Sequence, residues 1–334
     1  MRIGIIGFGF MGRMHFGCWS QLPETEVAAV CDANPDLVST FNETVGNIPG
    51  VPDTLSASNI AIYSSVDRML ESEQLDAVSI TLPTYLHADF SCDLLRRGLH
   101  VLCEKPMALN MRECDQMIAA AAQTGRKLMI AQCIRFWPAY AHTRDLIQSG
   151  QYGKVYSARF QRFSSRPSWS RDNWLMDKTQ SGGMPLDLHI HDADYVQSLF
   201  GMPIAVSSRA LHEPVDHIET QYRYDSDLIV SAEASWLAST SFGFRMNFEV
   251  LMEQASIIYD SSRDPAYLVY PNDGEPFMPP LSPKDGYYHE IDYFSRWIQG
   301  AIEKERITLQ DAKNSVRLIE AEMQSCQNGR CIEL

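Results

Sequence analysis

The sequence predicts an α/β protein with an N-terminal Rossmann domain, built on a doubly wound parallel sheet, and a C-terminal α+β domain with a broad, mostly antiparallel open sheet. Strand and helix patterns alternate through residues 1–131, and a glycine-rich turn opens that region. Short β-branched segments replace the alternation from residue 154 onward. We therefore expect an NAD(P)-binding domain over residues 1–131 and a substrate-binding and oligomerisation domain over residues 132–334.

The elements of the first region follow from short apolar runs, which predict buried strands, and from amphipathic spacing between them, which predicts covering helices. Gly98 and Gly125 follow two of these helices, as is typical of helix C-termini. The expected strands are 2–6, 26–31, 60–63, 76–82, 99–103 and 127–131, and the expected helices are 10–22, 35–44, 66–73, 86–97 and 110–124.

The second region begins with an expected linking helix over residues 138–150. Alternating runs separated by turn residues then predict an antiparallel sheet, and the Pro-rich stretch 271–283 is expected to be a loop. A sheet of this width needs cover on both faces, so we expect helices on one face and a second copy of the chain on the other. The expected strands are 154–163, 204–211, 218–224, 228–236, 243–250 and 255–260, and the expected helices are 185–200, 287–300 and 308–325.

The glycine-rich turn has the G-x-G-x-x-G spacing of a dinucleotide-binding site, with Gly7, Gly9 and Gly12 directly after the first strand. Gly7 permits a tight turn, Gly9 removes a side chain where a pyrophosphate approaches, and Gly12 lets the helix pack on the sheet. The N–H groups at the start of that helix then point toward the phosphates. The expected cofactor contacts in this turn are Gly7, Phe8, Gly9, Phe10, Met11 and Gly12.

Asp32 ends the second strand, where a carboxylate accepts hydrogen bonds from the hydroxyls of the adenosine ribose. The same carboxylate would repel a 2′-phosphate, and residues 33–38 contain no Arg or Lys that would attract one. The sequence therefore predicts NAD as the cofactor, in preference to NADP.

Composition limits the class of protein and its partners. The chain has 334 residues, of which 45% are hydrophobic and 21% charged, which is ordinary for a globular protein. Its net charge of −14, without a basic stripe, argues against nucleic-acid and anionic-membrane partners. The sequence lacks both a transmembrane run and a signal-peptide pattern, and its eight cysteines form no C-x-x-C pair. We therefore expect a cytoplasmic protein with free thiols.

Lys105 is the first candidate for chemistry. It follows the strand 99–103 in the sequence Glu104-Lys105-Pro106, and ligands of open parallel sheets lie at the carboxyl ends of strands. Pro106 restricts the backbone beside the lysine, and its peptide bond is a candidate for the cis form. A solvated lysine at a strand end is the competing interpretation. At the neighbouring strand end, the candidates for contact with the nicotinamide ribose are Thr81, Pro83 and His87, with helix capping as the alternative for the histidine.

The expected helix 185–200 carries Asp187 and His191 four residues apart and so on one face. Such a pair supplies a general base whose tautomer and pKa the carboxylate sets. The competing interpretation is an aspartate that stabilises the helix N-terminus beside a surface histidine. His189 and His191 also have the spacing of an H-x-H metal pair, but helical geometry separates the two rings and no third ligand cluster is near, so we expect no metal.

Aromatic side chains and forked donors gather around Arg135 and through residues 159–174. Such side chains suit a sugar, whose C–H faces stack and whose hydroxyls form hydrogen bonds, and they suit a core with salt bridges almost as well. The candidates for substrate contact are Arg135, Arg162 and Trp169.

Taken in order, these motifs resemble those of the glucose–fructose oxidoreductase, inositol dehydrogenase and MocA superfamily over essentially the whole chain. The resemblance rests on Gly7-x-Gly9-x-x-Gly12, Asp32, Thr81-x-Pro83-x-x-x-His87, Glu104-Lys105-Pro106 and Gly182-Gly183-x-x-x-Asp187-x-x-x-His191. It implies a nicotinamide-dependent conversion of a sugar, polyol or related compound. In that scheme Lys105 forms a hydrogen bond with the reacting hydroxyl and lowers the pKa of that hydroxyl. His191 removes the proton, and Asp187 positions the substrate or the lysine.

The resemblance further implies that Glu104 and Lys105 lie among the cofactor-binding residues, and that the chain forms a homodimer or homotetramer through the sheet of the second domain. His189 stands where many members of the superfamily have glycine, and His289 joins the substrate candidates. Two alternatives stay open. One is a redox-neutral, NAD-using enzyme of glycosidase or lyase type on the same fold, and the other is a non-catalytic NAD-binding regulator.

Overall fold

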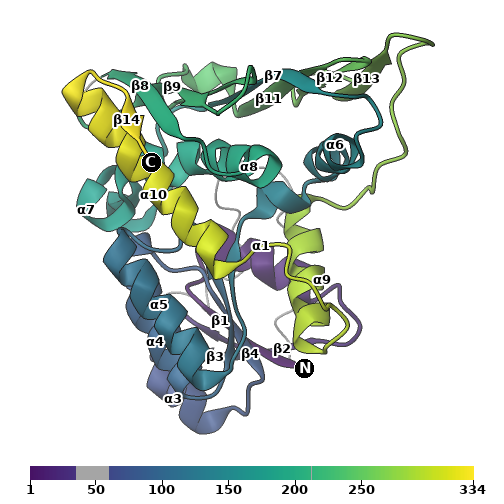
Figure 1. The fold of residues 1–334 in the computed structure, drawn as a ribbon. Helices are drawn as coiled ribbons and strands as arrows, with labels where there is room; N and C mark the ends of the chain where they lie inside the picture. The colour runs from purple at the N-terminus through teal and green to yellow at the C-terminus, as the bar shows by residue number, and fades with distance from the viewer. Residues whose placement is uncertain (35–59, 212) are drawn as a thin grey trace. The chain divides into compact units, whose positions relative to one another are not determined.

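A computed structural model describes residues 1–34, 60–211 and 213–334 (Figure 1). The described chain divides into two compact units. Unit 1 contains residues 1–133, 169–174 and 287–313, within the described ranges, and unit 2 contains residues 134–168, 175–286 and 314–334. A division of the chain into domains at residue 131 stays a prediction.

Unit 1 contains a six-stranded parallel sheet in the order β3-β2-β1-β4-β5-β6, as expected for a doubly wound fold. The direction of winding changes between β1 and β4, so the ends of these strands form the edge where such sheets bind ligands. Nearly every residue of β1, β2, β4, β5 and β6 is buried. The strands are β1 Arg2–Ile6, β2 Glu26–Cys31, β3 Ala61–Tyr63, β4 Ala77–Ile80, β5 His100–Glu104 and β6 Leu128–Ala131.

The helices of unit 1 lie on both sides of its sheet, with α3, α4 and α5 on one side and α1 and α9 on the other (Figure 1). The Asn110 side chain accepts a hydrogen bond from the Glu113 N–H at the start of α5, and Gly125 ends that helix in the left-handed conformation, as predicted. The expected helix 35–44 lies outside the described residues. The helices are α1 Phe10–Trp19, α3 Val66–Ser72, α4 His87–Arg96, α5 Met111–Thr124 and α9 Gly286–Ile298, with 3₁₀ turns η1 Thr84–Leu86 and η3 Arg171–Met176.

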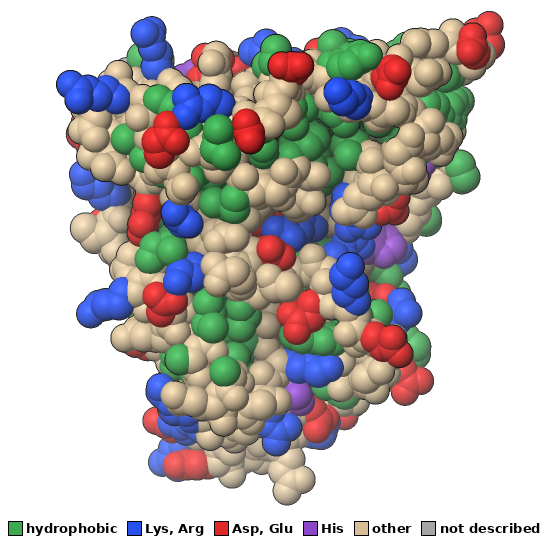
Figure 2. All heavy atoms as spheres, viewed as in Figure 1, with side chains coloured by type: hydrophobic (Ala, Val, Ile, Leu, Met, Phe, Trp, Pro, Cys, Tyr) green, Lys and Arg blue, Asp and Glu red, His purple; other side chains and the backbone are tan. Residues whose placement is uncertain are grey.

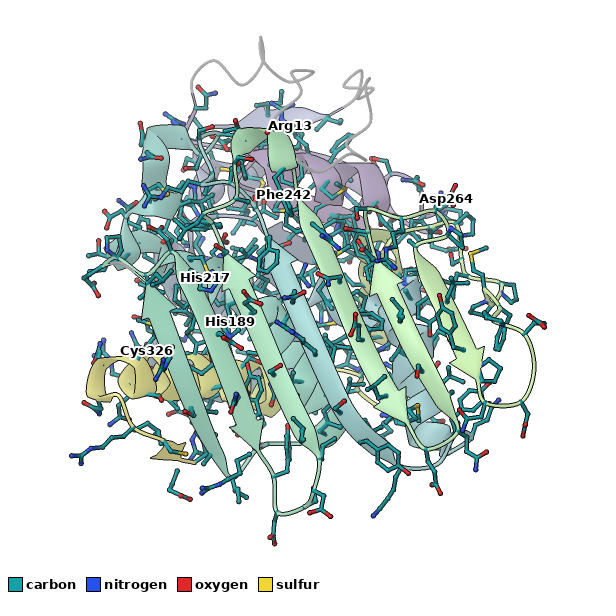
Figure 3. The ribbon with its side chains drawn as sticks, turned by 90° about the horizontal axis from the view of Figure 1, so that it is seen from above. Arg13, His189, His217, Phe242, Asp264 and Cys326 are labelled. Carbon is teal, nitrogen blue, oxygen red and sulfur yellow. The ribbon has the colours of Figure 1, made fainter. Side chains whose placement is uncertain are left out.

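Unit 2 contains an eight-stranded sheet in the order β13-β12-β11-β7-β10-β9-β8-β14 (Figure 3). Neighbouring strands are antiparallel except for β7 and β10, which pair in parallel at the centre. This agrees with the predicted mostly antiparallel sheet. The strands are β7 Val155–Phe163, β8 Ala205–Leu211, β9 His217–Arg223, β10 Ile229–Ser235, β11 Arg245–Met252, β12 Ala255–Asp260, β13 Tyr267–Pro271 and β14 Ile332–Glu333.

The predicted helix 185–200 is confirmed as a helical segment, although its first turn has π rather than α geometry. Residues Pro185–His189 form a π-helical turn, η4, in which the Ile190 N–H reaches back five residues to the Pro185 carbonyl, and the α-helix α8 occupies Ile190–Phe200. Isolated π turns of this kind occur frequently at functional sites. The other helical elements are η2 Cys133–Phe136, α6 Pro138–Ser149, α7 Lys178–Ser181, η5 Thr240–Phe242 and α10 Leu309–Asn328.

Lys and Arg side chains are interspersed with Asp and Glu over the face shown in Figure 2. Among the described helices, none is long and apolar enough to cross a bilayer.

Candidate functional site

The three glycines of the turn after β1 serve different purposes. Gly7 has a φ of +89°, and a Cβ added there would lie 2.6 Å from the Thr81 carbonyl oxygen. A Cβ on Gly12 would lie 2.1 Å from the Gly7 carbonyl oxygen, so both positions need glycine for the fold itself. A Cβ on Gly9 would meet no heavy atom within 4 Å. This open space beside the helix N-terminus fits a dinucleotide pyrophosphate.

These contacts predict opposite outcomes for two alanine variants. Gly12→Ala is expected to lower the free energy of unfolding by about 1–3 kcal/mol, because the new methyl group overlaps backbone. Gly9→Ala is expected to melt like the unmodified protein and to bind NAD about tenfold more weakly, because its methyl group enters the pyrophosphate position. Thermal melts with and without NAD measure both effects. Undiminished NAD binding by Gly9→Ala would place the pyrophosphate elsewhere.

Asp32 lies at the end of β2 with its carboxylate turned toward the glycine turn. Its Oδ2 accepts a hydrogen bond from the Phe8 N–H at 2.6 Å, and its Oδ1 accepts one from the Asn34 N–H at 2.7 Å. Arg171, from the η3 segment of unit 1, places Nη1 3.6 Å from Oδ1. Residues 33–38 contain no Arg or Lys, and no local sequence pattern indicates that Arg171 lies here.

Lys105 follows β5 in a loop whose neighbouring side chains are buried. From Val101 to Ala108, Lys105 alone is partly exposed. The Lys105–Pro106 peptide bond is cis, as its sequence suggested. The Glu104 carboxylate is buried, accepts the Lys105 N–H at 3.1 Å and lies 3.0 Å from His15 Nε2.

Glu104 also belongs to a buried acidic group at the same strand end. A carboxylate oxygen of Glu290 on α9 lies within 4.8 Å of the ligand-type atoms of His15 and Glu104. The 3.0 Å contact between His15 and Glu104 explains the position of the Glu104 side chain without a cation. Contact between this carboxylate and a cofactor stays a prediction.

His87 is the first residue of α4 and is buried. Its Nδ1 lies 2.8 Å from the Pro106 carbonyl oxygen and its Nε2 lies 2.9 Å from the Leu82 carbonyl oxygen. Burial lowers the pKa of the imidazole, against the opposing effect of the two carbonyls. The ring thus joins the loops after β4 and β5, and the expected alternative of helix capping is wrong, because α4 has no side-chain cap.

Thr81, directly after β4, joins the end of that strand to the end of β1, since its hydroxyl donates to the Gly7 carbonyl oxygen at 2.6 Å. Thr81 and Pro83 are partly exposed. Both therefore stay available as contacts for a nicotinamide ribose.

In unit 2, two residues of the segment formed by η4 and α8 differ from their neighbours in being partly exposed. Between Gly183 and Gln197 every residue is buried except Asp187 and His191. Met184 and Leu188, on either side of Asp187 in the sequence, belong to a hydrophobic cluster with Trp236. The packing therefore leaves Asp187 and His191 as the two partly exposed residues of the segment, although the Nδ1 atom of His191 is itself buried.

His189 does not share that accessibility. Its side chain is completely buried, and Nε2 lies 2.9 Å from Oε2 of Glu322 on α10, which is also buried. Among the described residues, the group of three potential metal ligands found within reach of one another lies in unit 1 and does not include His189 or His191.

Two of the substrate candidates, Arg135 and Arg162, form buried ion pairs. Arg135 holds both oxygens of Asp194 at 2.7 and 2.8 Å, and Arg162 holds both oxygens of Asp192 at 2.9 and 3.0 Å. Both aspartates belong to α8. These contacts support the interpretation of a core with salt bridges for the two arginines, and their contact with substrate stays a prediction. Trp169 is partly exposed and belongs to unit 1.

Comparison with known proteins agrees with this architecture. Residues 1–132 match the model of the oxidoreductase family with an NAD-binding Rossmann fold, and residues 140–258 match the GFO/IDH/MocA C-terminal domain. D-xylose 1-dehydrogenase (NADP(+)) 2 of Haloferax volcanii is 27% identical, with 98% of this chain and 99% of that protein aligned. The 2,7-anhydro-N-acetylneuraminate hydratase of Escherichia coli is 29% identical over 59% of this chain and 50% of that protein.

Among solved structures, levoglucosan dehydrogenase in complex with NADH and levoglucosan superimposes with a TM-score of 0.84 at 20% identity, covering 100% of this chain and 99% of that one. At that identity the likeness concerns the fold. The two family models together span both the parallel sheet and most of the broad sheet. This chain belongs to the GFO/IDH/MocA family of oxidoreductases with an NAD-binding Rossmann domain.

Proposed function

We propose that the chain is an NAD-dependent dehydrogenase that transfers hydride between nicotinamide and a secondary hydroxyl or carbonyl of a sugar, polyol or related compound. The selective exposure of Lys105, Asp187 and His191, each within an otherwise buried segment, carries the proposal. A fold that buries the neighbours of an ionisable residue while leaving that residue partly exposed is suited to proton transfer with a bound substrate. The name of the xylose dehydrogenase, which aligns over nearly the whole chain, supports sugars as the substrate class.

Each of the three side chains has one role in this proposal. The Lys105 ammonium donates a hydrogen bond to the reacting hydroxyl and stabilises the negative charge that develops there. His191 removes the proton, since imidazole gains and loses a proton near neutral pH. Asp187 positions the substrate or the lysine. When bound, the nicotinamide supplies the hydride acceptor.

The proposed cofactor is NAD, in preference to NADP. The carboxylate of Asp32 accepts the ribose hydroxyls, and the open space at Gly9 takes the pyrophosphate. The Haloferax relative is named for NADP, so the preference needs a direct measurement. The proposed contacts in the turn are Gly7, Phe8, Gly9, Phe10, Met11 and Gly12, with Thr81, Pro83 and Lys105 toward the nicotinamide.

We further propose a homodimer or homotetramer in the cytoplasm, formed through the outer face of the unit 2 sheet. Ile229 and Leu251 both pair with Ser157 and therefore lie on one face of the sheet, and Ile229 is 70% exposed. Exposed aliphatic side chains on an open sheet favour association with a second apolar surface. Light scattering of the purified protein measures the oligomeric state.

A thermal-shift titration with NAD and NADP, each oxidised and reduced, tests the proposed function first. A cofactor at 100 times its dissociation constant stabilises the folded state by about 2.7 kcal/mol. A shift with NAD, followed by NADH formation at 340 nm with a sugar or polyol, is the expected result. Absence of a shift with all four forms, in protein freed of carried-over cofactor, would refute the proposal.

The name of the Escherichia coli hydratase favours one second candidate, a redox-neutral reaction for which NAD, when bound, would supply a hydride acceptor that is regenerated within each turnover. Net NADH release distinguishes the two, because a dehydrogenase accumulates NADH and a redox-neutral enzyme does not. A third possibility, the non-catalytic regulator, predicts NAD binding without conversion of any sugar or polyol.

A further inference from the structure

Arg171 lies beside the carboxylate that the proposed function assigns to the adenosine ribose. Its Nη1 is 3.6 Å from Asp32 Oδ1, and its Nε is 3.7 Å from Asp172 Oδ2. The Arg171 side chain is 56% exposed, so its guanidinium is accessible to a ligand. Asp32, by contrast, is held in place by the backbone N–H groups of Phe8 and Asn34.

The backbone directly after Arg171 has an unusual conformation. Asp172 and Asn173 have φ angles of 53° and 55°, which side-chain-bearing residues seldom adopt. The Asn173 N–H donates to the Ser170 carbonyl oxygen at 3.0 Å and closes a tight turn around Arg171. Consecutive left-handed residues of this kind are found at ligand clamps more often than in ordinary loops.

The pairing changes the electrostatics at the end of β2. A lone carboxylate repels a 2′-phosphate, which is why Asp32 by itself predicts NAD. A guanidinium within 4 Å offsets that charge, and its planar fork binds phosphate oxygens through two parallel N–H···O bonds. One position thus offers an acceptor for a ribose diol and a donor for a phosphate.

We propose that Arg171 is a cofactor-specificity residue that binds the 2′-phosphate of NADP, so that the chain takes NADP as well as NAD. The proposal rests on the proposed function, because it assumes that a nicotinamide dinucleotide binds at the glycine turn. Asp32 makes the affinity for NAD higher than that for NADP, and Arg171 keeps the difference between the two affinities small.

Calorimetric titration of the full chain with NAD, NADP, AMP and adenosine 2′,5′-bisphosphate tests this without any substrate. The two nucleotides isolate the adenosine end, because they differ in the 2′-phosphate alone. Arg171→Ala is expected to weaken NADP and the bisphosphate about 10- to 100-fold, the effect of one charge-assisted contact, while NAD and AMP change less than about threefold. Arg171→Lys keeps the positive charge without the forked guanidinium. Its dissociation constants for NADP and the bisphosphate are expected to lie between those of the unmodified chain and those of Arg171→Ala.

Arg166→Ala is the matched control, because Arg166 is similarly exposed, at 55%, and is also paired with an aspartate, Asp216. It should leave the ratio of the NADP and NAD dissociation constants unchanged. In an Asp32→Asn background, Arg171→Ala should still weaken NADP, since the contact is with the phosphate. Loss of the effect in that background would limit Arg171 to neutralising Asp32 and overturn direct binding.

The outcomes separate the two levels of the argument. If the unmodified chain binds NAD but not NADP, or if Arg171→Ala binds NADP as tightly as the unmodified chain, the assignment of Arg171 is wrong and the dehydrogenase proposal stands. If the unmodified chain binds neither dinucleotide, both fail.

Discussion

Replacing Lys105 with methionine is expected to lower turnover by about 10²- to 10⁴-fold, measured as NADH formation with whichever sugar or polyol supports activity. The substitution nearly keeps the length of the side chain and removes the ammonium that is proposed to donate a hydrogen bond to the reacting hydroxyl. The dissociation constant of NAD should change far less than turnover, because the proposed pyrophosphate and ribose contacts at the glycine turn and Asp32 are untouched. His191→Asn should have an effect of the same order, since it removes the proposed base.

Lys127→Met is the control for this experiment. Lys127 is a partly buried lysine of unit 1 that donates to the Trp297 carbonyl oxygen and lies over the indole ring, and burial lowers its pKa. Its loss should affect stability and leave turnover nearly unchanged. Unaltered turnover in both Lys105→Met and His191→Asn would remove these side chains from the proposed mechanism.

Replacing Asp192 with alanine is expected to lower the free energy of unfolding by about 3–5 kcal/mol. The substitution leaves the buried Arg162 guanidinium without the carboxylate that it holds through Nε and Nη2. Removing one partner of a buried ion pair costs far more than the pair itself contributes, because a desolvated charge remains. Urea denaturation followed by circular dichroism measures the change.

Two further variants sharpen this test. Asp145→Ala breaks the pair between Arg144 and a largely exposed carboxylate, and should cost no more than about 1 kcal/mol. The double replacement of Arg162 with methionine and Asp192 with leucine removes both charges and should recover most of the lost stability. Equal losses for Asp192→Ala and Asp145→Ala would show that the buried pair is not important for folding.

Several features of the fold were predictable because their causes are local. Alternating apolar runs and amphipathic segments identified the parallel sheet, and Gly125 identified the end of α5. Strands β13 and β14 were not predicted, because β13 runs into Pro271 and β14 is two residues long. The π turn η4 was also missed. A single turn with an i to i+5 hydrogen bond shows the same pattern of apolar residues in the sequence as the first turn of an α-helix.

By itself, the sequence determined the glycine turn, the carboxylate at the end of β2, and the identity of Lys105, Asp187 and His191 as candidates. Each depends on backbone conformation or spacing within a short segment, which neighbouring residues specify.

Tertiary structure alone decided which polar groups meet. It placed Arg171 beside Asp32, His87 between two loop carbonyls, and the guanidinium of Arg162 against α8. These partners lie far apart in the sequence, and a buried charge or polar group takes whichever complementary group the packed chain brings within hydrogen-bond distance. Local sequence patterns do not predict these partners, because a polar group needs a protein partner only after packing has removed the water around it.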